Sequence, residues 1–162
     1  MMQTDVKSTH VMVGVSGLVY NGRTRLKGAV ISNTTSGTPA NVAFANNVSL
    51  VGTYTTSTTT CSVTVAAGHG LATGARVLLI FTSGGNAVGP YTVTVTSATV
   101  FTVAVASSSN SGNVLVYTNI LMEVDITNSV PINVLIPGEG IVANDGIYCG
   151  VPTNIAATVF YG

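Results

Sequence analysis

The chain alternates apolar and polar residues over short stretches, which is the pattern of half-buried β-strands. Over Tyr91–Thr96 the odd positions carry Tyr or Val and the even positions carry Thr, so one strand face would be apolar and the other hydroxyl-covered. The segment Phe101–Val105 repeats this arrangement with Phe and Val on one face. Helical signals are nearly absent. The pattern therefore predicts an all-β protein built from antiparallel sheets.

Turn-forming pairs separate these stretches at short intervals, as in Asn21-Gly22 and Asp145-Gly146. Many short strands with frequent turns favour a sandwich or a barrel over parallel βαβ units. Twelve strands are predicted: Leu26–Ile31, Ala40–Ala45, Ser49–Thr53, Thr60–Ala66, Arg76–Phe81, Gly89–Thr96, Val100–Val105, Asn113–Tyr117, Leu121–Ile126, Ile132–Ile136, Gly146–Cys149 and Ala156–Tyr161.

Two zones of different composition suggest how the chain is organised. Residues 54–118 are rich in Thr, Ser, Gly and Val and contain one charged residue, Arg76, whereas residues 12–53 and 119–162 hold more Ile, Leu, Asn and Pro. We expect a jelly-roll-like antiparallel β-sandwich from residues 12–53 plus 119–162, with a small β-barrel inserted at 54–118. Residues 1–11 would form an N-terminal arm. The polar run Thr55–Thr60 predicts a linker or the start of an exposed strand.

The content of charged residues is low, at 6%, against a hydrophobic content of 46% and a mean hydropathy of +0.55. A monomer with so few charges would have little to keep its surface soluble, so we expect burial in a homo-oligomer or a larger assembly. A monomer coated with Ser, Thr and Asn is the alternative. The N-terminal sequence predicts no signal peptide, and no apolar run is long enough for a transmembrane helix.

Five Lys and Arg residues balance five Asp and Glu residues, and these bases are too few to drive binding to nucleic acid. Three of the bases, Arg23, Arg25 and Lys27, form a local basic patch. Alternate residues share one face of a strand, so the patch would be an outward row that aids solubility. Contact with an acidic partner subunit is the alternative.

Few residues offer chemistry. His69, in Gly68-His-Gly70, has no second ligand at metal spacing nearby and is expected to cap backbone groups in a turn, while His10 would lie in the arm. Glu123 and Asp125 would share a strand face, where a glycosidase pair or a weak Ca²⁺ site is conceivable but a solvated face is favoured. Cys61 and Cys149 are too far apart for a disulfide framework and would be buried thiols in a reducing compartment. We therefore expect no enzyme activity, no catalytic or metal-binding residue and no cofactor.

The middle of the chain resembles a known repeat. Ala67-Gly-His-Gly-Leu-Ala-Thr-Gly74, then Asn86-Ala-Val-Gly-Pro-Tyr-Thr-Val-Thr-Val95 and Thr99-Val-Phe-Thr-Val103, are similar to the small β-barrel repeat of phage tail and virion proteins and to the FCCH-type barrel of ubiquitin-activating enzymes. The flanks resemble small phage virion proteins, through Arg23-Thr-Arg-Leu-Lys-Gly-Ala-Val-Ile31, Val134-Leu-Ile-Pro-Gly-Glu-Gly-Ile141, Asp145-Gly-Ile-Tyr148 and Ala157-Thr-Val-Phe-Tyr-Gly162. These resemblances imply a fold and a virion setting, and they carry over no active site.

The function that follows from this reading is structural. The chain is expected to be a bacteriophage capsid decoration (cement) subunit that binds itself, as a trimer by analogy, and the major capsid protein or other virion proteins. It would bind neither nucleic acid nor membrane. It would be made in the host cytoplasm and reside in the virion. The alternatives are a tail or fibre-attachment subunit and a module that binds a host-surface glycan or protein.

Overall fold

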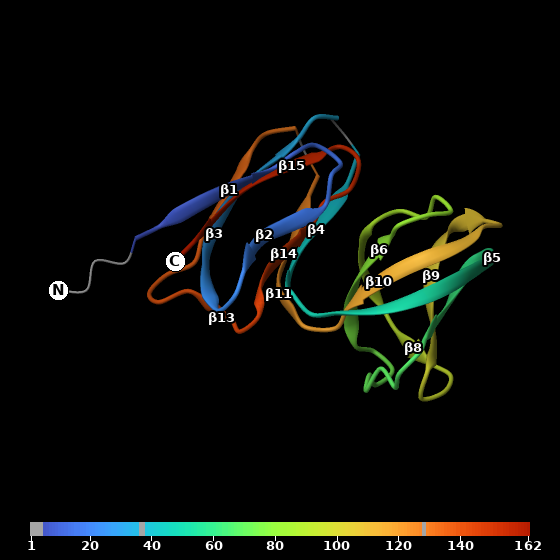
Figure 1. The fold of residues 1–162 in the computed structure, drawn as a ribbon. Coiled ribbons are helices and arrows are strands. Elements are labelled where there is room, and N and C mark those ends of the chain that lie inside the picture. Colours follow the sequence, from blue (N-terminus) through green and yellow to red (C-terminus); the bar gives the residue numbers. More distant parts are fainter. Residues whose placement is uncertain (1–4, 36–37, 128) are drawn as a thin grey trace. The chain divides into compact units, whose positions relative to one another are not determined.

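The structure is a computed structural model that describes residues 5–35, 38–127 and 129–162. All the regular secondary structure in these residues is β-strand, arranged in antiparallel sheets (Figure 1). The chain divides into two compact units, which we call the sandwich unit (Met1–Asn47 with Leu121–Gly162) and the barrel unit (Val48–Ile120). The predicted all-β fold is confirmed.

The sandwich unit consists of two sheets. In the first, the strands follow the order β1 (Lys7–Val11), β15 (Ile155–Tyr161), β3 (Thr24–Asn33) and β12 (Ile132–Leu135), and β13 (Ile141–Ala143) also pairs with β3. In the second, the order is β11 (Ile120–Ile126), β4 (Ala40–Asn46), β14 (Gly146–Gly150) and β2 (Gly17–Asn21).

The order in which the chain visits these sheets is that of a jelly roll. It passes from β1 to β2, β3 and β4 by changing sheet at each step, stays in the second sheet from β4 to β11, and then alternates again through β12 and β13, β14 and β15. If β12 and β13 count as one interrupted strand along β3, the unit has the eight strands and two sheets of that architecture. The barrel unit is inserted in the connection between β4 and β11.

The alternation of side chains along the strands builds the core between the two sheets. On β3, Leu26, Ala29 and Ile31 are fully buried, while Arg25 and Lys27 lie on the opposite, partly exposed face. Phe44 of β4 and Ile147 of β14 enter the same apolar cluster from the second sheet. Burial of apolar surface at about 25 cal/mol per Å² stabilises this packing.

The barrel unit is a single curled sheet, which forms a half-barrel. Its strands follow the order β7 (Gly89–Thr92), β6 (Arg76–Phe81), β10 (Ser111–Tyr117), β5 (Ser49–Val65), β9 (Val100–Ser108) and β8 (Thr94–Val95). β7 and β9 also approach one another, which curls the sheet around its own apolar cluster. Phe101, Val77 and Val63 are fully buried in that cluster.

β5 makes this curvature possible, because its two halves pair with different strands. Residues up to Thr55 pair with β10, whereas residues from Thr58 pair with β9, and the register shifts between Thr58 and Thr60. Where the strand bends back, the backbone of Gly52 lies so close to the Thr64 carbonyl that a Cβ at position 52 would clash with it. Glycine is therefore required at this position.

Several predicted boundaries need correction. Lys7–Val11, assigned to the N-terminal arm, form β1 and pair with β15 from Lys7–Tyr161 to Val11–Ala157, while residues 1–4 of that arm lie outside the described residues. The polar run Thr55–Thr60 is the middle of β5 and not a linker. β2 and β13 were not predicted, and the predicted strand Gly89–Thr96 is divided into β7 and β8. No helix in the described residues is long and apolar enough to cross a membrane.

Candidate functional site

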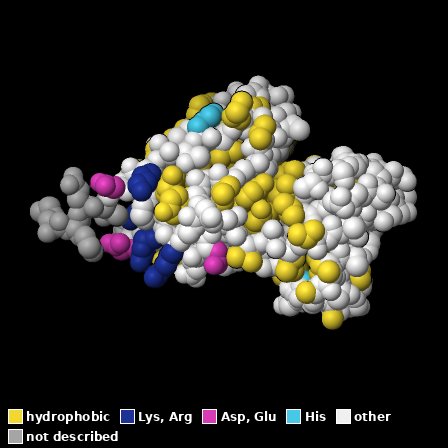
Figure 2. Space-filling model, in the orientation of Figure 1, with side chains coloured by type: hydrophobic (Ala, Val, Ile, Leu, Met, Phe, Trp, Pro, Cys, Tyr) yellow, Lys and Arg dark blue, Asp and Glu magenta, His cyan; other side chains and the backbone are white. Residues whose placement is uncertain are grey.

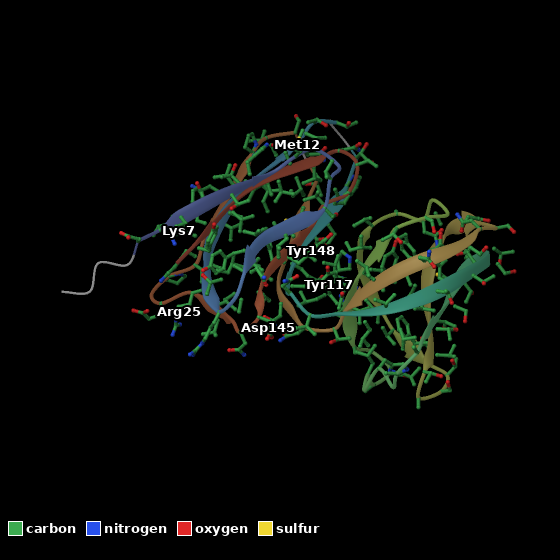
Figure 3. The ribbon with its side chains drawn as sticks, in the orientation of Figure 1. Lys7, Met12, Arg25, Tyr117, Asp145 and Tyr148 are labelled. Carbon is green, nitrogen blue, oxygen red and sulfur yellow. The ribbon has the colours of Figure 1, made fainter. Side chains whose placement is uncertain are left out.

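The feature of the sandwich unit that stands out by charge is the basic row, which we define as Arg23, Arg25 and Lys27. Arg25 and Lys27 lie on the outward face of β3, because Thr24 and Leu26 between them point inward and are buried. Arg23 precedes the strand in the turn after β2 and is exposed, so the row extends past the strand that was predicted to carry it. Arg25 is labelled in Figure 3, and Figure 2 shows the Lys and Arg side chains of this face gathered at one end of the sandwich unit.

The two arginines flank a hollow of about 350 Å³, whose walls also include Val142 of β13 and the last residue of the chain, Gly162. The backbones of Arg25 and Gly162 hold this wall together through two hydrogen bonds, of 3.2 and 3.1 Å. Neither guanidinium has a side-chain hydrogen bond or an ion pair within the described part of the chain. The arrangement can accept an anionic group, since guanidinium groups bind carboxylates in bidentate geometry.

Lys27 is held in place by a backbone group and not by a carboxylate. Its Nζ donates a hydrogen bond to the main-chain carbonyl of Glu139 at 2.9 Å, in the turn between β12 and β13. Pro137, Gly138 and Gly140 shape this turn, and a Cβ at Gly140 would clash with the Leu26 carbonyl. This hydrogen bond holds the ammonium on the outer face of β3. Because the acceptor is a neutral carbonyl, the contact does not neutralise the positive charge.

His69 has the structural role that the sequence predicts. Its Nδ1 accepts a hydrogen bond from the Leu71 amide at 3.0 Å, and its Nε2 lies 2.9 Å from the Ser97 carbonyl. Nδ1 is therefore unprotonated and Nε2 carries the proton, which it donates to Ser97. His69 is 8% exposed, and its ring packs edge-on against Phe101 with 5.4 Å between the ring centroids. Both nitrogens are used, so His69 caps backbone groups in the loop before β6.

His10 lies on β1 and not in an arm. Its Nδ1 is 3.3 Å from the Thr158 hydroxyl on β15, the residue opposite it in the strand pair. The side chain is exposed on the outer face of the sheet. This contact is a cross-strand pair and brings no second histidine or carboxylate to the ring.

Glu123 and Asp125 lie two residues apart on β11, as predicted. The carboxylate of Asp125 accepts a hydrogen bond from the side-chain amide of Asn41 on β4. Asp125 and Asn41 line a hollow of about 350 Å³ together with Pro39 and Ile126. The Asn41 Oδ1 is buried and has no hydrogen-bond partner among the described residues. Within the described residues no three His, Cys, Asp or Glu side chains gather where they could hold a metal ion.

The two cysteines are buried thiols in separate units. Cys149 lies in the core of the sandwich unit and Cys61 in that of the barrel unit, both without exposed surface. Burial raises the pKa of each thiol, and near Cys61 hydrogen bonds from Thr56 and Asn86 lower that pKa in part. The prediction that both are small buried hydrophobes is confirmed.

One surface feature was not found from the sequence. Met12, Val13 and Val15, in the connection between β1 and β2, are 66%, 46% and 58% exposed, and Leu18 at the start of β2 is 49% exposed. Met12 is labelled in Figure 3. The sequence did contain a sign of this exposed apolar surface. Apart from Gly14, every residue of Val11–Val15 is apolar, whereas a strand with one buried face needs an apolar residue only at every second position.

Searches against protein-family models, curated proteins and solved structures found no match for this chain.

Proposed function

We propose that the chain is a bacteriophage capsid decoration subunit, which acts by adhesion and not by catalysis. The jelly-roll winding of the sandwich unit is the observation that carries this proposal, because capsid proteins are among the recurrent uses of this architecture. Fold alone does not determine function, so the proposal also depends on the surface of the molecule and on its sequence motifs.

The surface supports an assembly role. With 6% charged residues, the chain has few groups that would repel a neighbouring subunit, and large apolar side chains such as Met12, Val15 and Leu135 stand exposed on the sandwich unit. Burying such side chains against other subunits would drive association. The motifs that resemble small phage virion proteins belong to β3, β12 to β14 and β15, which are all strands of the jelly roll.

The first experiment measures the mass of the purified protein by light scattering and then its binding to empty shells of the phage that encodes it. A decoration subunit is expected to form a stable oligomer, a trimer in the simplest case, and to saturate the shells with a copy number set by their symmetry. A monomer, or an oligomer that ignores the shells, contradicts the proposal and favours a tail or fibre-attachment role.

A second candidate is recognition of a host surface by the barrel unit. It is favoured by an uncharged, hydroxyl-rich tip, where Ser57, Thr58, Thr59, Ser107 and Ser109 are all exposed. Hydroxyl groups both donate and accept hydrogen bonds, which suits a neutral glycan. Binding of the purified protein to a glycan array would support this function, and an array without hits would count against it.

A further inference from the structure

We propose that the basic row is the surface through which this protein binds an acidic face of a protein partner. This inference rests on the proposed function, since it names the surface and the partner chemistry for the same assembly. It concerns three of the five Lys and Arg residues of the chain, concentrated within five positions. Of the remaining basic residues, Lys7 lies on β1 at the same end of the sheet, two strands away from β3, and Arg76 lies on β6 in the barrel unit.

The geometry of the row favours carboxylates spaced along an extended surface. Arg25 and Lys27 project from the same face of β3, and two residues of a strand span about 6.6 Å, so neighbouring charges can contact separate carboxylates. Arg23 and Arg25 also border the hollow of about 350 Å³, into which a partner side chain could insert. The planar guanidinium can bind such a carboxylate through two parallel hydrogen bonds.

Two of the five carboxylates of the chain are engaged by asparagines, whereas Asp5 and Glu139 lie beside the row, Asp5 next to Gly162 and Glu139 next to Lys27. Asp125 and Asp145 are engaged by Asn41 and Asn46, and the contact of Lys27 is with a carbonyl. The row brings three cations together within five positions, which makes it the densest cluster of positive charge in the chain, and Asp5 and Glu139 offset part of that charge. Such a patch steers association with a complementary negative surface.

An acidic protein fits better than nucleic acid. Three cations would neutralise few phosphates, and affinity for duplex DNA depends on the number of phosphates neutralised. Arginine is enriched at protein interfaces, and two of the three bases of the row are arginines.

The test compares binding to empty phage shells for the wild type, the triple variant Arg23→Gln/Arg25→Gln/Lys27→Gln and the control Arg76→Gln, which removes a positive charge from the barrel unit. Circular dichroism and light scattering would first establish that all three proteins share the same fold and oligomer. We expect the triple variant to bind at least about tenfold more weakly, with a reduced dependence on salt, and the control to bind within about twofold of the wild type.

The outcomes separate the two proposals. If the wild type and the triple variant bind shells equally and with the same salt dependence, the inference is wrong and the decoration role stands. If the wild type does not bind shells, the decoration role fails, and the inference that depends on it fails as well. In a competition experiment, an excess of a non-specific DNA duplex is added to the shell-bound proteins. If the duplex displaces the wild type but not the triple variant, the row binds nucleic acid and the inference is overturned.

Discussion

Thr58 adopts a backbone conformation that β-branched residues seldom adopt. Its φ is +55°, and it is the one non-glycine residue with a positive φ in the described ranges. The residue is exposed and lies at the register shift between β5 and β9, and its hydroxyl donates a hydrogen bond to the adjacent Ser57 carbonyl at 2.7 Å. Left-handed backbone costs an ordinary residue roughly 1–2 kcal/mol, whereas asparagine tolerates it.

The strain at Thr58 predicts that Thr58→Asn raises the free energy of unfolding, by up to about 1 kcal/mol. The neighbouring substitution Thr59→Asn is the matched control, because Thr59 is also exposed but has no positive φ. It should leave stability unchanged or lower it slightly, since asparagine is a poor strand former. Chemical denaturation of both variants measures the difference, and equal effects would contradict the explanation.

His69 contributes to stability through contacts at both ring nitrogens. His69→Ala would leave the Leu71 amide and the Ser97 carbonyl without their partner and would remove the edge contact with Phe101. We expect a loss of about 1–3 kcal/mol. His10→Ala is the control, because that exposed ring has a single long contact, and it should change stability by less than about 0.5 kcal/mol. Similar losses for both variants would show that the caps at His69 add nothing.

Two weak acids with raised pKa values predict how stability depends on alkaline pH. Burial raises the pKa of the Cys149 thiol above its ordinary value of 9.0 and that of the Tyr91 hydroxyl from 10.0 to about 12. The native protein therefore retains these protons while the unfolded chain loses them, so their contribution is full below pH 9 and declines as pH rises further. Denaturation at a series of pH values should show this fall, and Cys149→Ala should make it shallower. An unchanged slope in that variant would exclude Cys149 as a source.

At the scale of elements, local patterns predicted the strands whose apolar residues alternate clearly, such as β6 at Arg76–Phe81. They failed at β5, where Thr and Ser suggested a break but the burial from Val51 to Ser57 alternates strictly, with Tyr54 and Thr56 inside. β1 could not be predicted locally, because its polar residues become a strand only by pairing with β15 at the other end of the chain.

Gly52 decides whether β5 can bend, and Gly52→Ala should therefore destabilise the barrel unit by more than about 2 kcal/mol. The added methyl group would meet the Thr64 carbonyl, which the paired β9 holds in place. Gly89→Ala is the control, because a Cβ there has no atom within 4 Å and the residue has no positive φ. Thermal unfolding measures both, and comparable melting temperatures would show that β5 relaxes around the methyl group.

At the scale of the whole molecule, composition indicated an insertion over residues 54–118, and the contacts of the structure define a unit over Val48–Ile120. The boundaries differ because the residues that the unit gains at its two ends include apolar ones, such as Leu50 and Ile120, which resemble the composition of the flanking zones. The sequence predicted a jelly-roll-like sandwich, but the particular strand pairs, such as β1 with β15, join distant segments and could not be predicted from local patterns. The basic row could be located from the sequence, whereas its hollow depends on Val142 and Gly162, which are far from it along the chain.

The pairing of β5 with β10 predicts that the two units fold independently. Ser49 and Tyr117 are partners in this ladder, so the ends of the barrel unit lie side by side, and β4 and β11 are neighbours in the second sheet of the sandwich unit. Each unit also has its own apolar core. Replacing residues 48–120 by an Asn-Gly turn should leave a folded sandwich unit, because the remaining strands can be joined as a hairpin.

The isolated fragment Val48–Ile120 should fold as well, with lower stability than the sandwich unit because small domains bury a smaller share of their surface. Circular dichroism and denaturant titration of both pieces check this. Each piece is expected to unfold in one cooperative transition, and each of these transitions should lie close to one that the intact chain shows. A fragment that stays unfolded while the shortened sandwich unit folds would mean that the barrel unit needs the rest of the chain, and that the insertion is not an autonomous domain.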